Sequence, residues 1–332
     1  METNVTQTTP KRASLFRSDA MQQVMAFAAL ILLFVVFSLL SPNFRTISNI
    51  NGILIATAVN GILALGVTFV IITGGIDLSI GTVMTLSAVM TGVFITDWKL
   101  PIPLGIMAGL LTGTLAGFVN GTVIARMKVP PFIATLGMLN VAKGLSLIIS
   151  NLKPIYFDAT PAFNSIAMGS VIGKIIPGLP IPNGVLVFFG AAIVGSLILT
   201  KTVLGRYTFA LGSNEEAARL SGVNVNAWKI AVYSLTGLFA GLAGVVIASR
   251  VNSAQPSLGQ GYELDAIAAA VIGGTSLSGG EGTILGTVIG AFIISTLNNG
   301  LRILSVPQEW QIVATGVIVV AAVYLDIVRR RR

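Results

Sequence analysis

The sequence contains no cysteine and no histidine among its 332 residues. A chain without cysteine forms no disulfide and offers no thiolate to a metal ion. A chain without histidine has no imidazole base to activate a serine or cysteine nucleophile. Charged residues are also scarce, at 10% of the chain, whereas soluble proteins carry about 25%. These absences exclude most enzyme classes, and we expect no metal site and no cofactor.

Apolar residues make up 54% of the chain and give it a mean hydropathy of +0.89. With so few charges a soluble fold could not cover its own surface, so lipid must be the solvent for most of it. A membrane-spanning helix needs roughly 20 mostly apolar residues. About ten stretches qualify, of which the eighth is short: 22–40, 48–72, 79–96, 102–125, 131–150, 183–200, 228–248, 263–275, 282–300 and 309–326.

We therefore predict an all-α, multi-pass membrane protein whose transmembrane domain covers residues 22–327. Lysine and arginine gather on the cytoplasmic side of membrane proteins. If the N-terminus is cytoplasmic, most of these residues fall on that side, together with the long loop 201–227, and both termini are cytoplasmic. Residues 1–21 and 328–332 are then cytoplasmic tails. Because the basic residues flank apolar runs, the net charge of +8 does not indicate nucleic-acid binding.

A short motif occurs twice. Gly74 to Ser79 and Gly273 to Ser278 both read GGxxLS, and each is soon followed by Gly-Thr and an apolar stretch. Transporters use pairs of glycine-interrupted segments to place a solute pathway at the interface between two repeats. The predicted topology gives both copies the same orientation, which fits poorly with a simple inverted five-plus-five repeat.

Few polar residues lie within the apolar stretches. Asp77 has two readings, because a carboxylate there can cap the next helix or contact a solute. Glu263 and Asp265 are expected in the first turn of a helix, where carboxylates complement the helix dipole. The asparagines serve either helix packing or a polar solute. The candidates for lining a pathway are Asp77, Ser79, Asn60, Asn120, Asn140, Ser276, Asn298 and Asn299.

The string Leu277 to Glu281, LSGGE, resembles the signature sequence of ABC ATPases. In those proteins its amides hold a nucleotide phosphate at a helix start. Here the chain has no GxxxxGK[ST] phosphate loop, and no soluble stretch is long enough for a nucleotide-binding domain. We therefore expect that this chain does not hydrolyse ATP by itself.

The cytoplasmic loop carries a predicted short amphipathic helix. Ser213 or Asn214 can cap it, Glu215 and Glu216 suit its first turn, and Gly222 supplies its stop. Two interpretations remain open at this point. The helix is a tether lying on the membrane surface, or it is a knob that docks on a cytoplasmic partner.

A resemblance to a known family lies in the segment LGRYTFALGSNEEAARLSGVNV, in the GGIDLSIG element, and in the stretch from Gly261 to Phe292 with Leu297-Asn298-Asn299-Gly300-Leu301. Through these residues the sequence closely resembles the permease subunits of bacterial ribose-type sugar ABC importers. The resemblance covers roughly residues 40–327. It implies ten spans in the inner membrane, two permease copies, a cytoplasmic sugar ATPase and a periplasmic sugar-binding protein. It also implies that the matching loop is the coupling helix to the ATPase, with Asn214, Glu215, Glu216, Ala218, Arg219 and Gly222.

The expected function is uptake of ribose or a similar monosaccharide, powered by the partner ATPase. Two rivals come from other classes. An ion-coupled secondary carrier needs a relay of intramembrane carboxylates, and Asp77 is nearly alone. An intramembrane enzyme needs a nucleophile and a base, and the chain lacks histidine and cysteine.

Overall fold

The computed structural model describes residues 19–176 and 178–331. Its regular structure is helical apart from two short strands, which confirms the prediction of an all-α membrane protein. Eight of the described helices are long and apolar enough to cross a membrane. They are α1 (Asp19–Leu40), α2 (Ile47–Ile72), α3 (Ile80–Gly92) with its π-helical continuation η3 (Val93–Asp97), α4 (Ile102–Ala125), α5 (Pro131–Ile149), α8 (Asn183–Lys201), α11 (Val225–Val251) and α13 (Ile284–Ile303).

Two of the ten predicted spans are not among these eight. α12 (Tyr262–Ile272) has 11 residues, about half of what a bilayer requires, so 263–275 is not a full span. α14 (Gln308–Arg331) coincides with the predicted span 309–326, and several of its side chains lie outside the described part of the chain. The predicted tail 1–21 is also largely outside it. At the other tail only the helical backbone, up to Arg331, is described.

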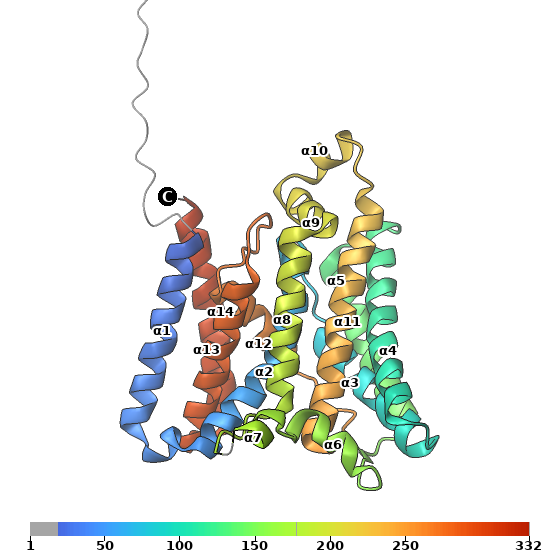
Figure 1. Ribbon diagram of the computed structural model, residues 1–332. Helices are drawn as coiled ribbons and strands as arrows, with labels where there is room; N and C mark the ends of the chain where they lie inside the picture. Colours follow the sequence, from blue (N-terminus) through green and yellow to red (C-terminus); the bar gives the residue numbers. More distant parts are fainter. Residues whose placement is uncertain (1–18, 177, 332) are drawn as a thin grey trace, which may run out of the picture.

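The remaining elements lie at the two ends of the bundle (Figure 1). α1 begins and α14 ends at the same end as α10 (Figure 1). A two-residue antiparallel pairing at the other end sets Ile155 opposite Ala254. The end at which α1 begins carries α9 (Val203–Ser213) and α10 (Glu215–Leu220), and the opposite end carries α6 (Pro161–Met168) and α7 (Val171–Ile175) (Figure 1). The other short elements are η2 (Pro42–Arg45), between α1 and α2, and the paired strands β1 (Ile155–Tyr156) and β2 (Ser253–Ala254).

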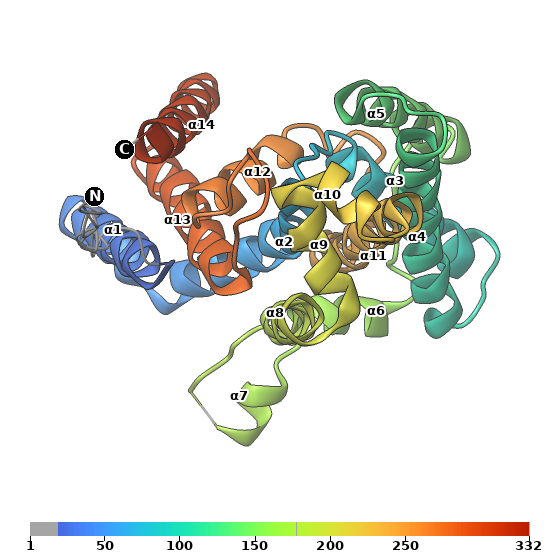
Figure 2. The same ribbon diagram turned by 90° about the horizontal axis from the view of Figure 1, so that it is seen from above.

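α2 is the centre of the bundle. Of its apolar span 94% is buried in the protein, against 11% for α1. Viewed along the bundle, α2 lies between α12 and α13 on one side and α11 on the other (Figure 2). Two of its buried polar side chains are satisfied by its own backbone, since the Thr57 and Thr68 hydroxyls donate to carbonyl oxygens one turn earlier, at 2.8 and 2.7 Å. Thr68 also hydrogen-bonds Thr287 of α13 at 2.7 Å.

The helices form two inverted halves, α2 to α5 and α11 to α14. In the first half α2 and α4 run toward the α10 end, whereas in the second α11 and α13 run away from it (Figure 1). The packing is reciprocal, because α11 packs on α3 and α4 as α2 packs on α12 and α13 (Figure 2). This arrangement resolves the conflict left by the GGxxLS motif. Both copies of the motif follow a helix running toward the α10 end, so they are not the inverted pair.

Glycines bring α4 and α11 into backbone contact. A Cβ atom at Gly121 would lie 2.7 Å from the Ile230 Cα atom, and one at Gly117 would lie 3.1 Å from the Gly237 Cα atom. Side chains larger than hydrogen do not fit between these helices. In a membrane, where apolar burial drives helix association little, such close packing holds helices together.

Candidate translocation and coupling sites

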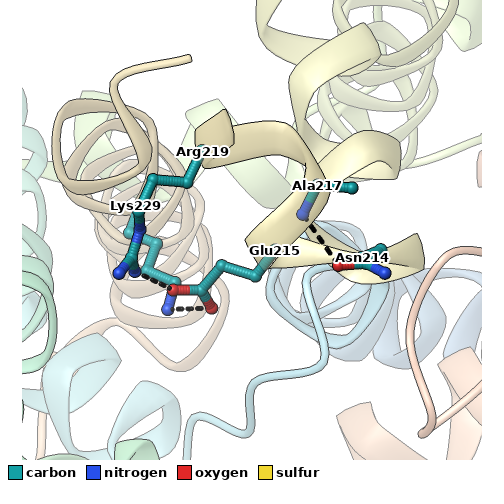
Figure 3. Close-up of polar contacts among 5 residues, drawn as sticks. All are labelled: Asn214, Glu215, Ala217, Arg219 and Lys229. Atoms are coloured by element: carbon teal, nitrogen blue, oxygen red, sulfur yellow. Dashed lines mark hydrogen bonds and ion pairs between the residues drawn. The ribbon is translucent and has the colours of Figure 1, made fainter. Parts of the chain in front are cut away.

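α10 is built as predicted. The Asn214 side-chain oxygen accepts a hydrogen bond from the Ala217 N–H at 2.9 Å, which caps the helix (Figure 3). Glu215 and Glu216 occupy the first turn, where they complement the helix dipole. After the helix, Gly222 adopts a positive φ of 84°, a conformation that glycine adopts without strain. The local sequence therefore specifies both ends of this short helix.

Glu215 holds α10 against the start of α11. Its carboxylate pairs with Arg219 at 3.0 Å and with Lys229 of α11 at 2.6 Å (Figure 3). Ala218 is buried in a small cluster with Leu211 of α9 and Val225 of α11. Two residues of the predicted coupling set, Glu215 and Ala218, thus face the protein itself.

The outward surface of α10 is formed by other side chains. Glu216, Arg219 and Leu220 are exposed, and Leu220 has 82% of its surface free. An apolar side chain that is exposed at this end of the bundle is available for contact with a partner protein. The sequence-based coupling set did not include Leu220, although its place after EEAAR at the end of a short helix could have signalled it.

Asp77, Ser79 and Asn120 form one polar group, here called the α3 cluster. The Asp77 carboxylate accepts from the Ser79 N–H at 2.8 Å and from the Ser79 hydroxyl at 2.6 Å. Asn120 of α4 donates to the same hydroxyl at 2.9 Å. All three are buried at the start of α3. Asp77 thus orders the turn that leads into α3, but it does not cap that helix, because the cap residue is Ser79 and no side chain accepts from the first helical amides.

A narrow gap adjoins the α3 cluster. Asp77, Ser79 and Asn120 line it together with Thr236 of α11, and it does not admit a water molecule. The Tyr233 hydroxyl of α11 lies close to Gly75 and is buried without a hydrogen-bond partner among the described residues. In this conformation the gap beside Asp77 therefore leaves no room for a sugar.

A second group, the α12 cluster, joins Asn60, Asp265 and Asn298. The Asn60 and Asn298 amides donate to one Asp265 oxygen at 3.5 and 3.3 Å. Asp265 therefore has side-chain partners beyond the dipole role expected from the sequence. Glu263 does act at the helix start, since both its oxygens lie 3.1 Å from the Gly261 nitrogen.

The two clusters correspond under the inverted repeat. Each has a carboxylate at or just before the start of a helix, α3 or α12, and an asparagine from the helix that follows it, α4 or α13. The sequence pointed to all of their residues as site candidates except Asp265, whose partner Asn60 lies 205 positions away.

The other three predicted pathway residues lie elsewhere. Asn140 is exposed on α5 and donates to the Leu136 carbonyl of its own helix at 3.1 Å. Asn299 donates to the Asn49 side chain at 2.9 Å. Ser276 is buried after α12, where its hydroxyl accepts from the Ser278 N–H at 3.2 Å. This last bond matches the one that Asp77 accepts from Ser79 in the first GGxxLS copy.

A family model described as branched-chain amino acid transport system / permease component matches residues 49–323. The chain belongs to this family. It is 42% identical to the ribose import permease protein RbsC of Haemophilus influenzae over 304 residues, 91% of this chain and 92% of that one. Identity to RbsC of Bacillus subtilis is also 42%, over 327 residues and 98% of each chain. The fructose import permease protein FrcC of Rhizobium meliloti is 38% identical over 274 residues, 82% of this chain and 76% of that one.

Family membership confirms the resemblance drawn from the motifs. This permease is a transport subunit, and the comparison argues against the ion-coupled carrier that the sequence had left open. The LSGGE string accordingly belongs to a permease, in the connection between α12 and α13.

Proposed function

We propose that this permease takes up ribose or a similar monosaccharide as the membrane subunit of an ATP-binding-cassette importer in the bacterial inner membrane. The observation that carries the proposal is α10, a capped helix that projects from one end of the bundle with Leu220 exposed (Figure 1). The names of the relatives, which import ribose and fructose, support the substrate class.

The proposal assigns the energy source to a separate chain. A cytoplasmic sugar ATPase binds the α10 end and hydrolyses ATP, and a periplasmic sugar-binding protein docks at the opposite end. Closure of the ATPase pushes α10 and switches the permease between two arrangements by rigid-body movement. The side of α10 and of both termini is cytoplasmic in this scheme.

The α3 and α12 clusters are the proposed lining of the sugar pathway. Sugar hydroxyls both donate and accept hydrogen bonds, and carboxylate and amide groups together offer both functions. Contacts of this kind must stay weak, because a solute has to leave as readily as it enters. Asn140, Ser276 and Asn299 stay predicted members of the lining.

We also propose that two copies of the permease form one complex. The apolar spans of α1 and α5 are only 11% and 17% buried, which leaves apolar faces for lipid and for a second copy. Co-purification of two differently tagged copies from one membrane tests this point, and a single-copy mass by native mass spectrometry of the complete importer would contradict it.

Reconstitution tests the function directly. Proteoliposomes holding the permease and its ATPase are given labelled ribose, with and without ATP and the binding protein. We expect uptake only when all components are present, and competition by unlabelled fructose and xylose ranks the sugars. Uptake by the permease alone on an ion gradient would overturn the proposal.

A further inference from the structure

Three segments distant in the sequence meet beneath α10. They are the end of α2 (Ile72–Gly74), the end of α9 (Gly212–Ser213) and the loop after α12 (Gly279–Gly280). The Gly280 N–H donates to the Ile72 carbonyl at 2.8 Å, which satisfies an oxygen at the end of α2 that has no partner within the helix. We call this meeting point the backbone junction.

Glycine is required on both sides of the backbone junction. A Cβ atom at Gly212 would collide with the Ile72 carbonyl oxygen, which is part of the backbone. One at Gly279, where φ is 83°, would lie 2.9 Å from the Gly212 oxygen and 3.0 Å from the Gly74 nitrogen. The three segments therefore touch through main-chain atoms, which cannot relax by changing side-chain rotamers.

Each segment is continuous in the chain with a functional element, either within a few residues or through the length of α12 or α13. The Ile72–Gly74 segment continues within a few residues to Asp77 of the α3 cluster. The Gly279–Gly280 loop follows α12, which carries Asp265, and precedes α13, which carries Asn298. Gly212 and Ser213 immediately precede Asn214, the cap of α10. A displacement of α10 at this end therefore reaches both polar clusters through contiguous backbone.

α10 has a second connection, to α11. It consists of the partly exposed pair of Glu215 with Lys229 and the packing of Ala218 on Val225. Long charged side chains in contact with water adapt to small displacements, so such a pair is a compliant link. The backbone junction is the stiffer of the two routes.

We infer that the backbone junction of Gly212, Ile72 and Gly280 is the route by which movement of α10 reaches the sugar pathway. Its glycines are then positioning residues for transport. The inference rests on the proposed function, in which closure of the ATPase moves α10.

Matched insertions at the two ends of α10 test the route. Two glycines inserted between Ser213 and Asn214 loosen the connection to the backbone junction, and the same pair between Val223 and Asn224 loosens the connection to α11. Both insertions preserve the asparagine caps of the following helices. ATPase co-purification and thermal unfolding of the permease show that each variant folds and binds its partner.

We expect the first insertion to keep ATPase binding and ATP hydrolysis but to lower ribose uptake at least about fivefold, the lower end of typical coupling between sites. The second insertion retains most of the uptake. We expect Gly212→Ala to lower ribose uptake without adding chain length. Gly190→Ala, at a helical glycine with open space around it, is the control and leaves ribose uptake unchanged.

The result that overturns the inference is equal uptake by the two insertion variants, or full uptake by an assembled Gly212→Ala importer. Absence of uptake by the complete wild-type system would instead overturn the proposed function, so the two failures are distinguishable.

Discussion

At the scale of single residues, two carboxylates define the interior. A carboxylate buried within a membrane protein is costly unless it has hydrogen-bond partners. Asp77 offsets this cost with the Ser79 N–H and hydroxyl, and Asp265 does so with two asparagine amides. Both side chains therefore have an architectural role whether or not a sugar touches them.

Substitution of Asp77 separates these roles. We expect Asp77→Ala to destabilise the permease by about 1–3 kcal/mol, because the buried donors of Ser79 lose their acceptor. Asp77→Asn keeps a side-chain oxygen and most of the stability. Thermal unfolding in detergent measures both variants. An alanine variant that unfolds like the wild type would contradict the role of Asp77 in ordering the turn before α3. An asparagine variant that folds normally without uptake would assign the carboxylate to the sugar.

At the scale of elements, the residues of the α10 motif fall into two sets, one facing the protein and one facing outward. Its caps follow from adjacent residues and were predictable, but the direction of each side chain depends on α9 and α11. Glu215 is tied to Lys229, fourteen positions later in the chain. Leu220 and Glu216 are left to face outward. The proposed docking surface is therefore the face of α10 opposite the ion pairs.

Leu220→Asp is the variant for the docking surface. We expect it to weaken ATPase binding by about 2 kcal/mol, the size of an interface hot spot, and to leave the unfolding temperature unchanged because the side chain is exposed. Pull-down of the ATPase measures the first effect. Glu215→Ala is the matched control. It removes the ion pair that anchors α10 to α11, and we expect it to weaken ATPase binding less than Leu220→Asp does. The reverse order would show that Glu215 contacts the ATPase.

The contact between α4 and α11 gives a second prediction at this scale. Gly117→Val places a branched side chain against the α11 backbone, and overpacking of this kind costs about 1–3 kcal/mol or more. We expect a lower unfolding temperature and less protein in the membrane. Gly137→Val, on α5 with open space around the glycine, is the control. Equal stability of the two variants would contradict the close packing.

At the scale of the whole molecule, hydropathy predicts the class of membrane protein and most of its spanning helices. It does not predict which helices are central in the bundle and which are peripheral. α1 and α2 are similar apolar runs, although one is peripheral and the other central, because lipid and protein are equally apolar surroundings. The inverted halves have no visible sequence match, and the one visible repeat, GGxxLS, is a local turn. Of the α12 cluster the sequence indicated Asn60 and Asn298 but not Asp265, and it could not show that the three meet, because only the fold brings them together.

Single cysteines test the orientation of the whole permease. Because the chain has no cysteine of its own, Leu220→Cys and Ile175→Cys each carry one thiol at opposite ends of the bundle, on side chains that are 82% and 74% exposed. We expect a membrane-impermeant maleimide to label Ile175→Cys in intact spheroplasts and Leu220→Cys only after permeabilisation. The opposite pattern would place α10 outside.

The central position of α2 also has a consequence for biogenesis. α2 leaves the ribosome well before α11, α12 and α13, its later neighbours. During synthesis its core face must therefore rest in lipid, with Thr57 and Thr68 bonded to their own helix. Lipid is then replaced by protein when the second half inserts. Assembly of this permease is thus a late event in translation, and chains truncated before α13 will lack a finished core.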